Sequence, residues 1–164
     1  AIALLFNVVL NIFLWNPLEV GCRKVFVDCR YGNAEWRDIL YAFKNGYGHI
    51  GAVMFMKDLF TFLWTLLFII PGIIKGYEYM MIPYLLAENP DMSRQDAFAE
   101  SKRMMDGNKM DAFVLDLSFI GWFILEKISF GLAGLFFVRP YYETVFAELY
   151  EANKQKAYRE GYIR

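Results

Sequence analysis

The chain has 164 residues, a length that suits one domain. Hydrophobic residues make up 57% of it and charged residues 21%, with a mean hydropathy of +0.27. Because soluble domains are usually only about 45–50% apolar, we expect an integral membrane protein. The formal net charge of −1 argues against a nucleic-acid-binding protein, which would present a basic face.

The positive charges are grouped along the chain. Most of the 17 Lys and Arg residues lie in three segments, 21–49, 88–109 and 151–164. Loops on the cytoplasmic side of a membrane are enriched in these residues. We therefore place the three segments in the cytoplasm, including the C-terminal tail, 151–164.

The sequence contains no pattern of metal or cofactor ligands. Cys22 and Cys29 are the only cysteines, and on one helix they lie too far apart along its axis to bridge easily. One histidine and no Cys-x-x-Cys provide no zinc pattern. We expect no cofactor.

Residues 1–15 are uncharged and apolar but too short to cross a membrane. They extend over about 22 Å as a helix, whereas the hydrocarbon core is about 30 Å thick. We interpret this stretch as the remainder of a span that starts before residue 1. The whole chain, 1–164, is then a single membrane domain that lacks its N-terminal span.

The segment 17–48 has the pattern of two short basic amphipathic helices. Asn16 and Pro17 are typical of a helix start. Two apolar stripes follow at helical spacing: Cys22, Val25, Phe26 and Cys29, and then Trp36, Ile39, Leu40 and Phe43. Such helices suit the membrane surface, and they suit equally the underside of a helical bundle.

The clearest membrane span covers residues 52–70, and no charge occurs from Leu59 through Ile74. Pro71 and Gly72 then interrupt the helix. Either the helix kinks and continues, or the chain turns back as a hairpin. A return to the cytoplasm agrees with the positive charges that follow, so we favour a hairpin with its turn on the far side.

Polar and apolar segments alternate after this point. Segment 88–109 reads as a cytoplasmic loop whose helix is capped by Ser93 and ended by Gly107. Residues 111–128 form the next predicted span. Arg139 and Pro140 begin a last helix, which continues into the tail.

Four charged residues within or beside the apolar segments are candidate ligand, ion or structural charges: Lys75, Glu78, Asp116 and Arg139. Lys75 and Glu78 are three apart and can pair on one helix face. Asp116 could face a basic side chain, Lys57, Lys75 or Arg139, or it could lie near the headgroups. Arg139 and Glu143 form an i, i+4 pair. An unpaired charge deep in a bilayer costs roughly 2.5–3.5 kcal/mol, so ion or substrate contact is one hypothesis and an interfacial structural role the other.

Motifs of known enzyme classes are absent from the sequence. It contains no Gly-x-Ser-x-Gly, no His-Glu-x-x-His and no phosphate-binding loop. Ser101 and Ser118 lack a plausible base, because His49 is the only histidine. We assign no catalytic residue.

A series of different short motifs lies between residues 63 and 150. Their members are Pro71, Gly72, Tyr77, Tyr79, Glu88, Asn89, Pro90, Ser101, Gly107, Asn108, Lys109, Gly121, Trp122, Pro140 and Tyr141. In this order the motifs resemble a bacterial integral-membrane family, domain of unknown function 975. A weaker likeness runs to membrane domains attached to some glycerophosphodiester phosphodiesterases. The resemblance implies a multi-pass protein of the bacterial cytoplasmic membrane and supplies no established activity.

The expected fold is all-α: a polytopic transmembrane helical bundle with cytoplasmic amphipathic helices and a helix pair broken at Pro71-Gly72. Two functions fit it. The first is a non-enzymatic membrane scaffold or accessory protein, which binds the lipid bilayer, other membrane proteins or anionic lipid headgroups, and no nucleic acid. The second is a small transporter or lipid-handling protein that uses the four candidate charges.

Overall fold

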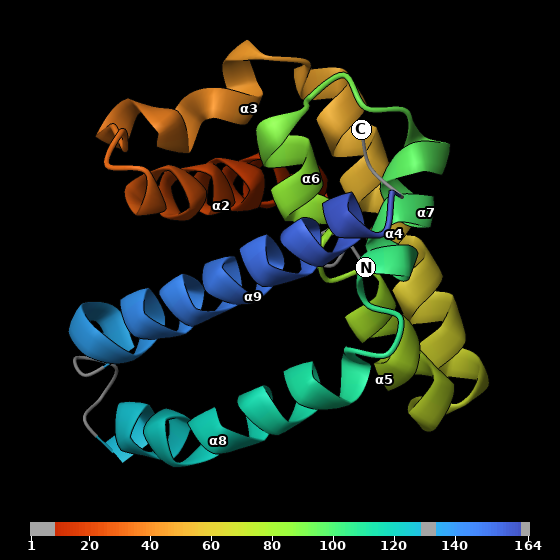
Figure 1. Cartoon of the computed structure of the whole chain (residues 1–164), viewed down its shortest axis with the longest axis vertical. Helices are drawn as coiled ribbons and strands as arrows, with labels where there is room; N and C mark the ends of the chain where they lie inside the picture. Colours follow the sequence, from red (N-terminus) through yellow and green to blue (C-terminus); the bar gives the residue numbers. More distant parts are fainter. Residues whose placement is uncertain (1–8, 129–133, 162–164) are drawn as a thin grey trace.

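The protein is helical throughout the part of the chain that the structure describes. The computed structural model describes residues 9–128 and 134–161, and no β-strand occurs in these two ranges (Figure 1). The all-α fold class is therefore confirmed. More than half of the expected first span, 1–15, and the end of the predicted tail lie outside the described residues.

The helices follow one another with short connections. In chain order they are η1 (Asn11–Trp15), α2 (Asn16–Arg30), η2 (Trp36–Leu40), α3 (Tyr41–Lys44), α4 (Tyr47–Leu67), α5 (Ile69–Glu78), α6 (Ile82–Glu88), α7 (Arg94–Met104), α8 (Lys109–Ile128), η3 (Gly134–Val138) and α9 (Arg139–Arg159). The turns η1 and η3 are π-helical and run directly into α2 and α9, while η2 is a 3-10 helix.

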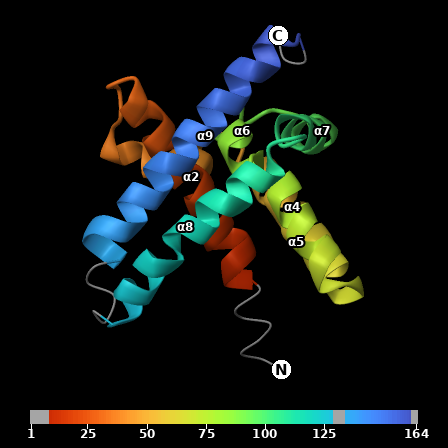
Figure 2. The same ribbon diagram turned by 60° about the horizontal axis from the view of Figure 1, so that its bottom comes forward.

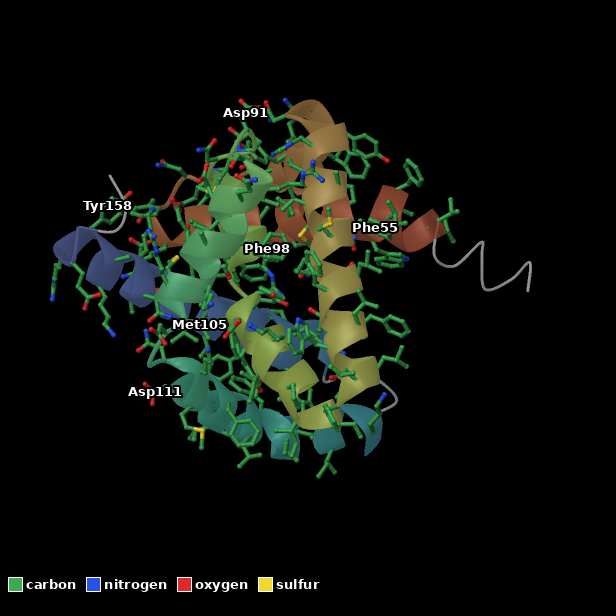
Figure 3. All side chains as sticks on the ribbon, turned by 90° about the vertical axis from the view of Figure 1, so that its right-hand side faces the viewer. Phe55, Asp91, Phe98, Met105, Asp111 and Tyr158 are labelled. Carbon is green, nitrogen blue, oxygen red and sulfur yellow. The ribbon has the colours of Figure 1, made fainter. Side chains whose placement is uncertain are left out.

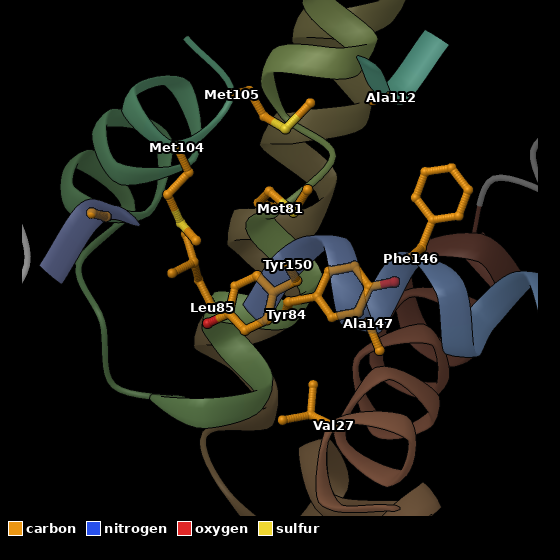
Figure 4. Packing of buried hydrophobic residues seen from close by; sticks show 11 residues of the cluster. Val27, Met81, Tyr84, Leu85, Met104, Met105, Ala112, Phe146, Ala147 and Tyr150 are labelled. Atoms are coloured by element: carbon orange, nitrogen blue, oxygen red, sulfur yellow. The ribbon is translucent and has the colours of Figure 1, made fainter. Parts of the chain in front are cut away.

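The short helix α6 lies at the centre of the molecule, and its residues from Ile82 to Ala87 are all buried. One face of α6 places Tyr84 and Leu85 in a hydrophobic cluster with side chains from α2, α7, α8 and α9 (Figure 4). The opposite face places Ile82 and Leu86 in a second cluster with α2, α3, α4 and α7. The surrounding helices therefore pack on α6 from both sides.

Helix α2 is packed into the bundle. Of the two positions considered for segment 17–48, the membrane surface and the underside of a helical bundle, α2 therefore takes the second. Its buried apolar side chains are Val20 and Val27, whereas Cys29 of the predicted stripe is exposed. The face of α2 with Val20 and Val27 is buried because it packs against both clusters. The spacing of apolar residues alone could not predict which face is buried. Asn16 is no N-cap, because the chain is already helical at Trp15.

Helices α4 and α5 form an antiparallel hairpin that turns at Phe68 (Figure 2). Phe68 has extended backbone angles (φ −154°, ψ 137°) and separates the two helices. The arms approach closely at Gly72, where a Cβ would lie 2.4 Å from Thr65 Oγ1. The hairpin, and not the kink, is therefore the observed geometry. Its turn precedes Pro71, which lies in the first turn of α5, where the missing N–H breaks no helical hydrogen bond.

Helices α7, α8 and α9 begin within two residues of their predicted starts. Ser93 caps α7 by accepting a hydrogen bond from the Asp96 backbone N–H (3.2 Å). Gly107, with a φ of +78°, lies between α7 and α8 in a conformation that favours glycine. Helices α8 and α9 meet through aromatic rings, such as Phe119 and Tyr142, whose centroids are 5.1 Å apart.

The most apolar stretch of the chain lies on the outside. The side chains of the hairpin turn, Leu66–Ile70, are 64–73% exposed. In Figure 2 this turn, the C-terminal end of α8 and the η1 end of α2 all point to one side, and the C-terminal end of α9 points to the other. Among the described helices only α4 is long and apolar enough to cross a membrane, so the polytopic arrangement is not confirmed.

Candidate functional site

Glu78 is the most buried of the four candidate charges. It ends α5 with 5% of its surface exposed. Its Oε2 accepts a hydrogen bond from Lys75 Nζ at 2.5 Å, and its Oε1 accepts one from Lys109 Nζ at 2.6 Å. The expected contact between Lys75 and Glu78 is present. Lys109 completes the site from the first turn of α8, and two ammonium groups compensate the burial of the carboxylate.

A second set of contacts holds α7 and α9 to this site. The Ser101 hydroxyl, fully buried on α7, donates a hydrogen bond to the Glu78 carbonyl oxygen at 2.6 Å. The Asn108 side-chain amide donates to the Met104 carbonyl oxygen and to Asn153 Oδ1, both at 2.9 Å. The motif residues Ser101 and Asn108 therefore join α5, α7 and α9 where Lys109 begins α8.

Asp116 has hydroxyl partners and none of the three basic partners considered for it. Tyr77 donates its OH to Oδ2 and Tyr142 donates its OH to Oδ1, each at 2.6 Å. Both carboxylate oxygens are thus hydrogen-bonded across three helices, α5, α8 and α9. Of the alternatives considered for Asp116, contact with a lysine or arginine is not the observed one. Nothing in the local spacing of the sequence marked Tyr142 as its partner.

Arg139 lies apart from the other three charges. Its guanidinium pairs with Glu126 Oε1 at 3.1 Å, and its side chain is 63% exposed. Glu143, the i+4 residue, pairs instead with Arg23 of α2. The candidate charges therefore occupy three separate places rather than one common site.

A further polar contact links α6 to α9. Glu88 Oε2 accepts a hydrogen bond from the Tyr150 OH (2.7 Å), and Oε1 accepts one from Lys154 Nζ (2.6 Å). Burial lowers the pKa of the Lys154 ammonium, but the hydrogen bond and the charge of Glu88 outweigh it and raise that pKa. The Tyr150 ring stacks on Tyr84, with 5.1 Å between the centroids. Arg23 Nη1 donates to the Tyr84 OH at 3.1 Å.

The remaining motif residues have simpler surroundings. Tyr79 packs against Phe98, which lies on the inner side of α7 (Figure 3), with 4.9 Å between the ring centroids. Asn89 ends α6, and Pro90 lies near Gly46. Exposed positions on α8 and at the start of α9 are occupied by Gly121, Trp122, Pro140 and Tyr141. Gly121 allows no close helix approach, because a Cβ there would meet open space.

Two grooves run along the α4–α5 hairpin. One, of about 430 Å³, is bordered by charged side chains, among them Arg23 and Lys57, and by Phe62 and Thr65 nearer the turn. The other, of about 330 Å³, has Asp116 at its edge beside Thr65 and Ile73. No group of three or more His, Cys, Asp or Glu side chains that could hold a metal occurs within residues 9–128 and 134–161.

The fold and the site define an all-helical protein in which buried ion pairs and tyrosine–carboxylate contacts lie at the base of an exposed apolar hairpin. A family model described as "Protein of unknown function (DUF975)" matches residues 49–157, well over half of the chain. The chain therefore belongs to the DUF975 family. No curated protein and no solved structure matches it. The likeness to the membrane domains of glycerophosphodiester phosphodiesterases is not shown.

Proposed function

We propose that this protein is a non-enzymatic scaffold or accessory protein of the bacterial cytoplasmic membrane. It holds its apolar hairpin in lipid and presents its polar helices and C-terminal tail to partners in or at the membrane. The observation that carries this proposal is the exposed run Leu66–Ile70, whose five side chains are 64–73% exposed. Contiguous exposed apolar surface of this kind marks a membrane or protein interface.

The pairing of the candidate charges favours a scaffold over a transporter. Both carboxylate oxygens of Glu78 and both of Asp116 already accept hydrogen bonds from protein groups. An ion or a substrate that bound to either carboxylate would have to displace a tyrosine or a lysine. Such saturated contacts stabilise helix packing.

Trp36 is the side chain best placed to contact a partner. It is 74% exposed on η2, and the Arg37 guanidinium lies 5.4 Å from the centroid of its ring. Aromatic and arginine side chains are enriched at interfaces between proteins. An indole beside a cation equally suits a headgroup layer with anionic lipids.

A small transporter or lipid-handling protein is the second candidate function. One observation favours it: Asp116 stands at the edge of a groove that continues along the apolar hairpin. A charged group beside an apolar channel could receive an ion or an amphiphile. On this alternative the transported group would replace the hydroxyls of Tyr77 and Tyr142 as the hydrogen-bonding partners of Asp116.

Flux measurements separate the two functions. The full chain is reconstituted into vesicles that enclose a pH-sensitive or cation-sensitive dye, beside Asp116→Asn and a matched control, Asp111→Asn, at an exposed position of α8. A scaffold gives no flux above that of empty vesicles with any of the three proteins. Flux that is present in the wild type and in Asp111→Asn but lost in Asp116→Asn would establish the transporter and overturn the scaffold.

A cross-linking experiment tests the scaffold directly. A photoreactive amino acid replaces Trp36 in one variant and Trp122, 49% exposed on α8, in another. In native membranes the probe at position 36 is expected to form discrete protein adducts, and the probe at position 122 to react with lipid. Absence of protein adducts at position 36 contradicts the scaffold function.

A further inference from the structure

We propose that the α4–α5 hairpin enters only one leaflet of the bilayer and returns, with its turn, Leu66–Ile70, at the bilayer midplane. The inference rests on the membrane location proposed above and adds the depth of insertion. It identifies the surface that contacts lipid, the partner as the acyl chains of a single leaflet, and the charged groups that stay at the headgroups.

The first argument is the length of the uncharged part of α4. On α4 the last charged residues are Lys57 and Asp58, and the helix then continues only to Leu67. Nine further residues at 1.5 Å each reach about 14 Å. The hydrocarbon core is about 30 Å thick, so one leaflet is about 15 Å deep. The arm therefore matches half of the bilayer and falls far short of the whole.

The second argument is the set of polar contacts at the base of the hairpin. Asp58 Oδ2 accepts a hydrogen bond from the Asn16 amide at 3.0 Å, and Lys57 Nζ lies 3.8 Å from Glu19 on the same helix, α2. On the returning arm, Glu78 lies between two lysine ammonium groups. These ionic groups join the hairpin to the rest of the protein. If the turn reached the far headgroups, all of them would lie near the middle of the bilayer, where charges are rare and costly.

The third argument is the turn itself. Its five side chains are hydrocarbon only, and they are the most exposed stretch of the hairpin. The Phe68 N–H donates to the Trp64 carbonyl oxygen, and the Gly72 N–H donates to the Phe68 carbonyl oxygen. Between them, Pro71 has no N–H, so it removes one donor that the first turn of a helix would leave unsatisfied in lipid. A turn at the far surface would need none of these features, because water and headgroups would satisfy polar groups there.

The α8–α9 pair provides an internal contrast. Its described end contains Glu126, Lys127 and Arg139, of which Arg139 is 63% exposed. That end is suited to headgroups or water, whereas the end of the α4–α5 hairpin contains no charged or hydrogen-bonding side chain. The two ends therefore differ in the environment they suit, although both point to the same side of the molecule (Figure 2).

Spin-label depth measurements test the proposal. The full chain, with Cys22 and Cys29 replaced by alanine, receives one nitroxide at a time in vesicles of phosphatidylethanolamine and phosphatidylglycerol. The label is placed at Phe68 in the turn, at Leu59 at the base of the arm, or at Lys102, exposed on α7, as a water-exposed control. Collision rates with oxygen and with a water-soluble nickel chelate give the depth of each label, and circular dichroism confirms that each variant is folded.

The half-depth proposal expects the ratio of oxygen to nickel collisions to be highest at Phe68, intermediate at Leu59 and lowest at Lys102, with nickel supplied to both sides. Nickel access to Phe68 only from the side opposite to Lys102 means that the hairpin crosses the bilayer, which overturns the half-depth inference and leaves the membrane function standing. Equal nickel access at Phe68 with and without vesicles means that the hairpin is not in lipid. That result overturns both.

Discussion

At the scale of single residues, Ser101 connects two helices through one hydrogen bond. Its hydroxyl is completely buried and donates to the Glu78 carbonyl oxygen at 2.6 Å. We expect Ser101→Ala to lower the free energy of unfolding by about 1–2 kcal/mol, because the buried carbonyl oxygen loses its donor. The exposed Ser118, which donates within its own helix, provides the control, and Ser118→Ala should change stability by less than about 0.5 kcal/mol. Denaturant unfolding in detergent micelles measures both, and equal effects would contradict the inter-helix role of Ser101.

Glu100 gives a prediction that depends on pH. Burial, and then the neighbouring negative charge of Asp96, raise the pKa of its carboxyl above the usual 4.5. The fold therefore favours the protonated form, and this contribution is complete below about pH 4.5 and lost as the pH rises through the raised pKa. Glu100→Gln keeps the neutral form at every pH. Because the side chain is only half-buried, we expect a gain of a few tenths of a kcal/mol at pH 7.

The same substitution should have no effect on stability near pH 4, where Glu100 itself is largely neutral. The exposed Glu160, near the end of α9, provides the control as Glu160→Gln. Thermal unfolding of the wild type and both variants at pH 7 and pH 4 measures the change in stability. A stabilisation of Glu100→Gln that persists unchanged at pH 4 would rule out the electrostatic origin.

The residue contacts predictable from the sequence are those within one helix. Lys75 with Glu78, and Ser93 with Asp96, lie within one turn and are observed as expected. Local spacing could not reveal that Asp116 receives hydroxyls from two other helices. For the same reason the expected pairing of Arg139 within its helix fails, since tertiary packing brings each member of that pair to a closer partner elsewhere.

At the scale of elements, Gly72 sets the distance between the two arms of the hairpin. A Cβ there would lie 2.4 Å from Thr65 Oγ1 and 2.6 Å from Thr65 Cα, so alanine forces the arms apart. We expect Gly72→Ala to cost about 1–3 kcal/mol of stability. At Gly76, one turn further, the nearest atom is Thr61 Cγ2 at 3.9 Å.

Gly76→Ala is therefore the matched control, and better helix propensity should make it neutral or stabilising by up to about 1 kcal/mol. Chemical unfolding in detergent, with both variants side by side, measures the difference. If the two substitutions have the same effect, the arms do not pack as closely at Gly72 as the structure has them.

Strong local signals made α4, α7, α8 and α9 predictable as elements, because each has a long apolar run or a capping residue. The central helix α6 has no capping residue and no apolar run of its own. It lies in an apolar run, 73–87, that reads as one returning segment, and its burial on both faces depends on helices far apart in the sequence. The turn at Phe68 was likewise hidden, since Pro71 and Gly72 are the stronger breakers in the sequence and yet fit inside the first turn of α5.

At the scale of the whole molecule, apolar side chains form both a buried core and a separate exposed surface. Two clusters around α6 form an ordinary core, yet the uncharged stretch Leu59–Ile74 projects away from it. The buried ionic contacts lie between core and projection, around Glu78 at the end of α5. Composition predicts a membrane protein, and on the proposal above the projecting hairpin is the part that enters lipid.

The fold also limits which segments could lie on opposite sides of a membrane. The Asn108 amide, just before α8, joins α7 to α9, because it donates to the Met104 carbonyl oxygen and to Asn153 Oδ1, both at 2.9 Å. Lys102 on α7 and Lys156 on α9 are both exposed near this contact. Single cysteines at positions 102 and 156, in a chain without its native cysteines, should therefore react together or not at all with a membrane-impermeant maleimide. This holds whatever depth the hairpin reaches.

Because the proposed location of both segments is cytoplasmic, we expect neither Lys102→Cys nor Lys156→Cys to be labelled in intact bacterial spheroplasts, and both to be labelled after lysis. Labelling of both in intact cells would reverse the orientation of the protein and leave its fold unaffected. Labelling of only one from outside would place a bilayer between α7 and α9. The hydrogen-bonded contact between these helices does not allow that result.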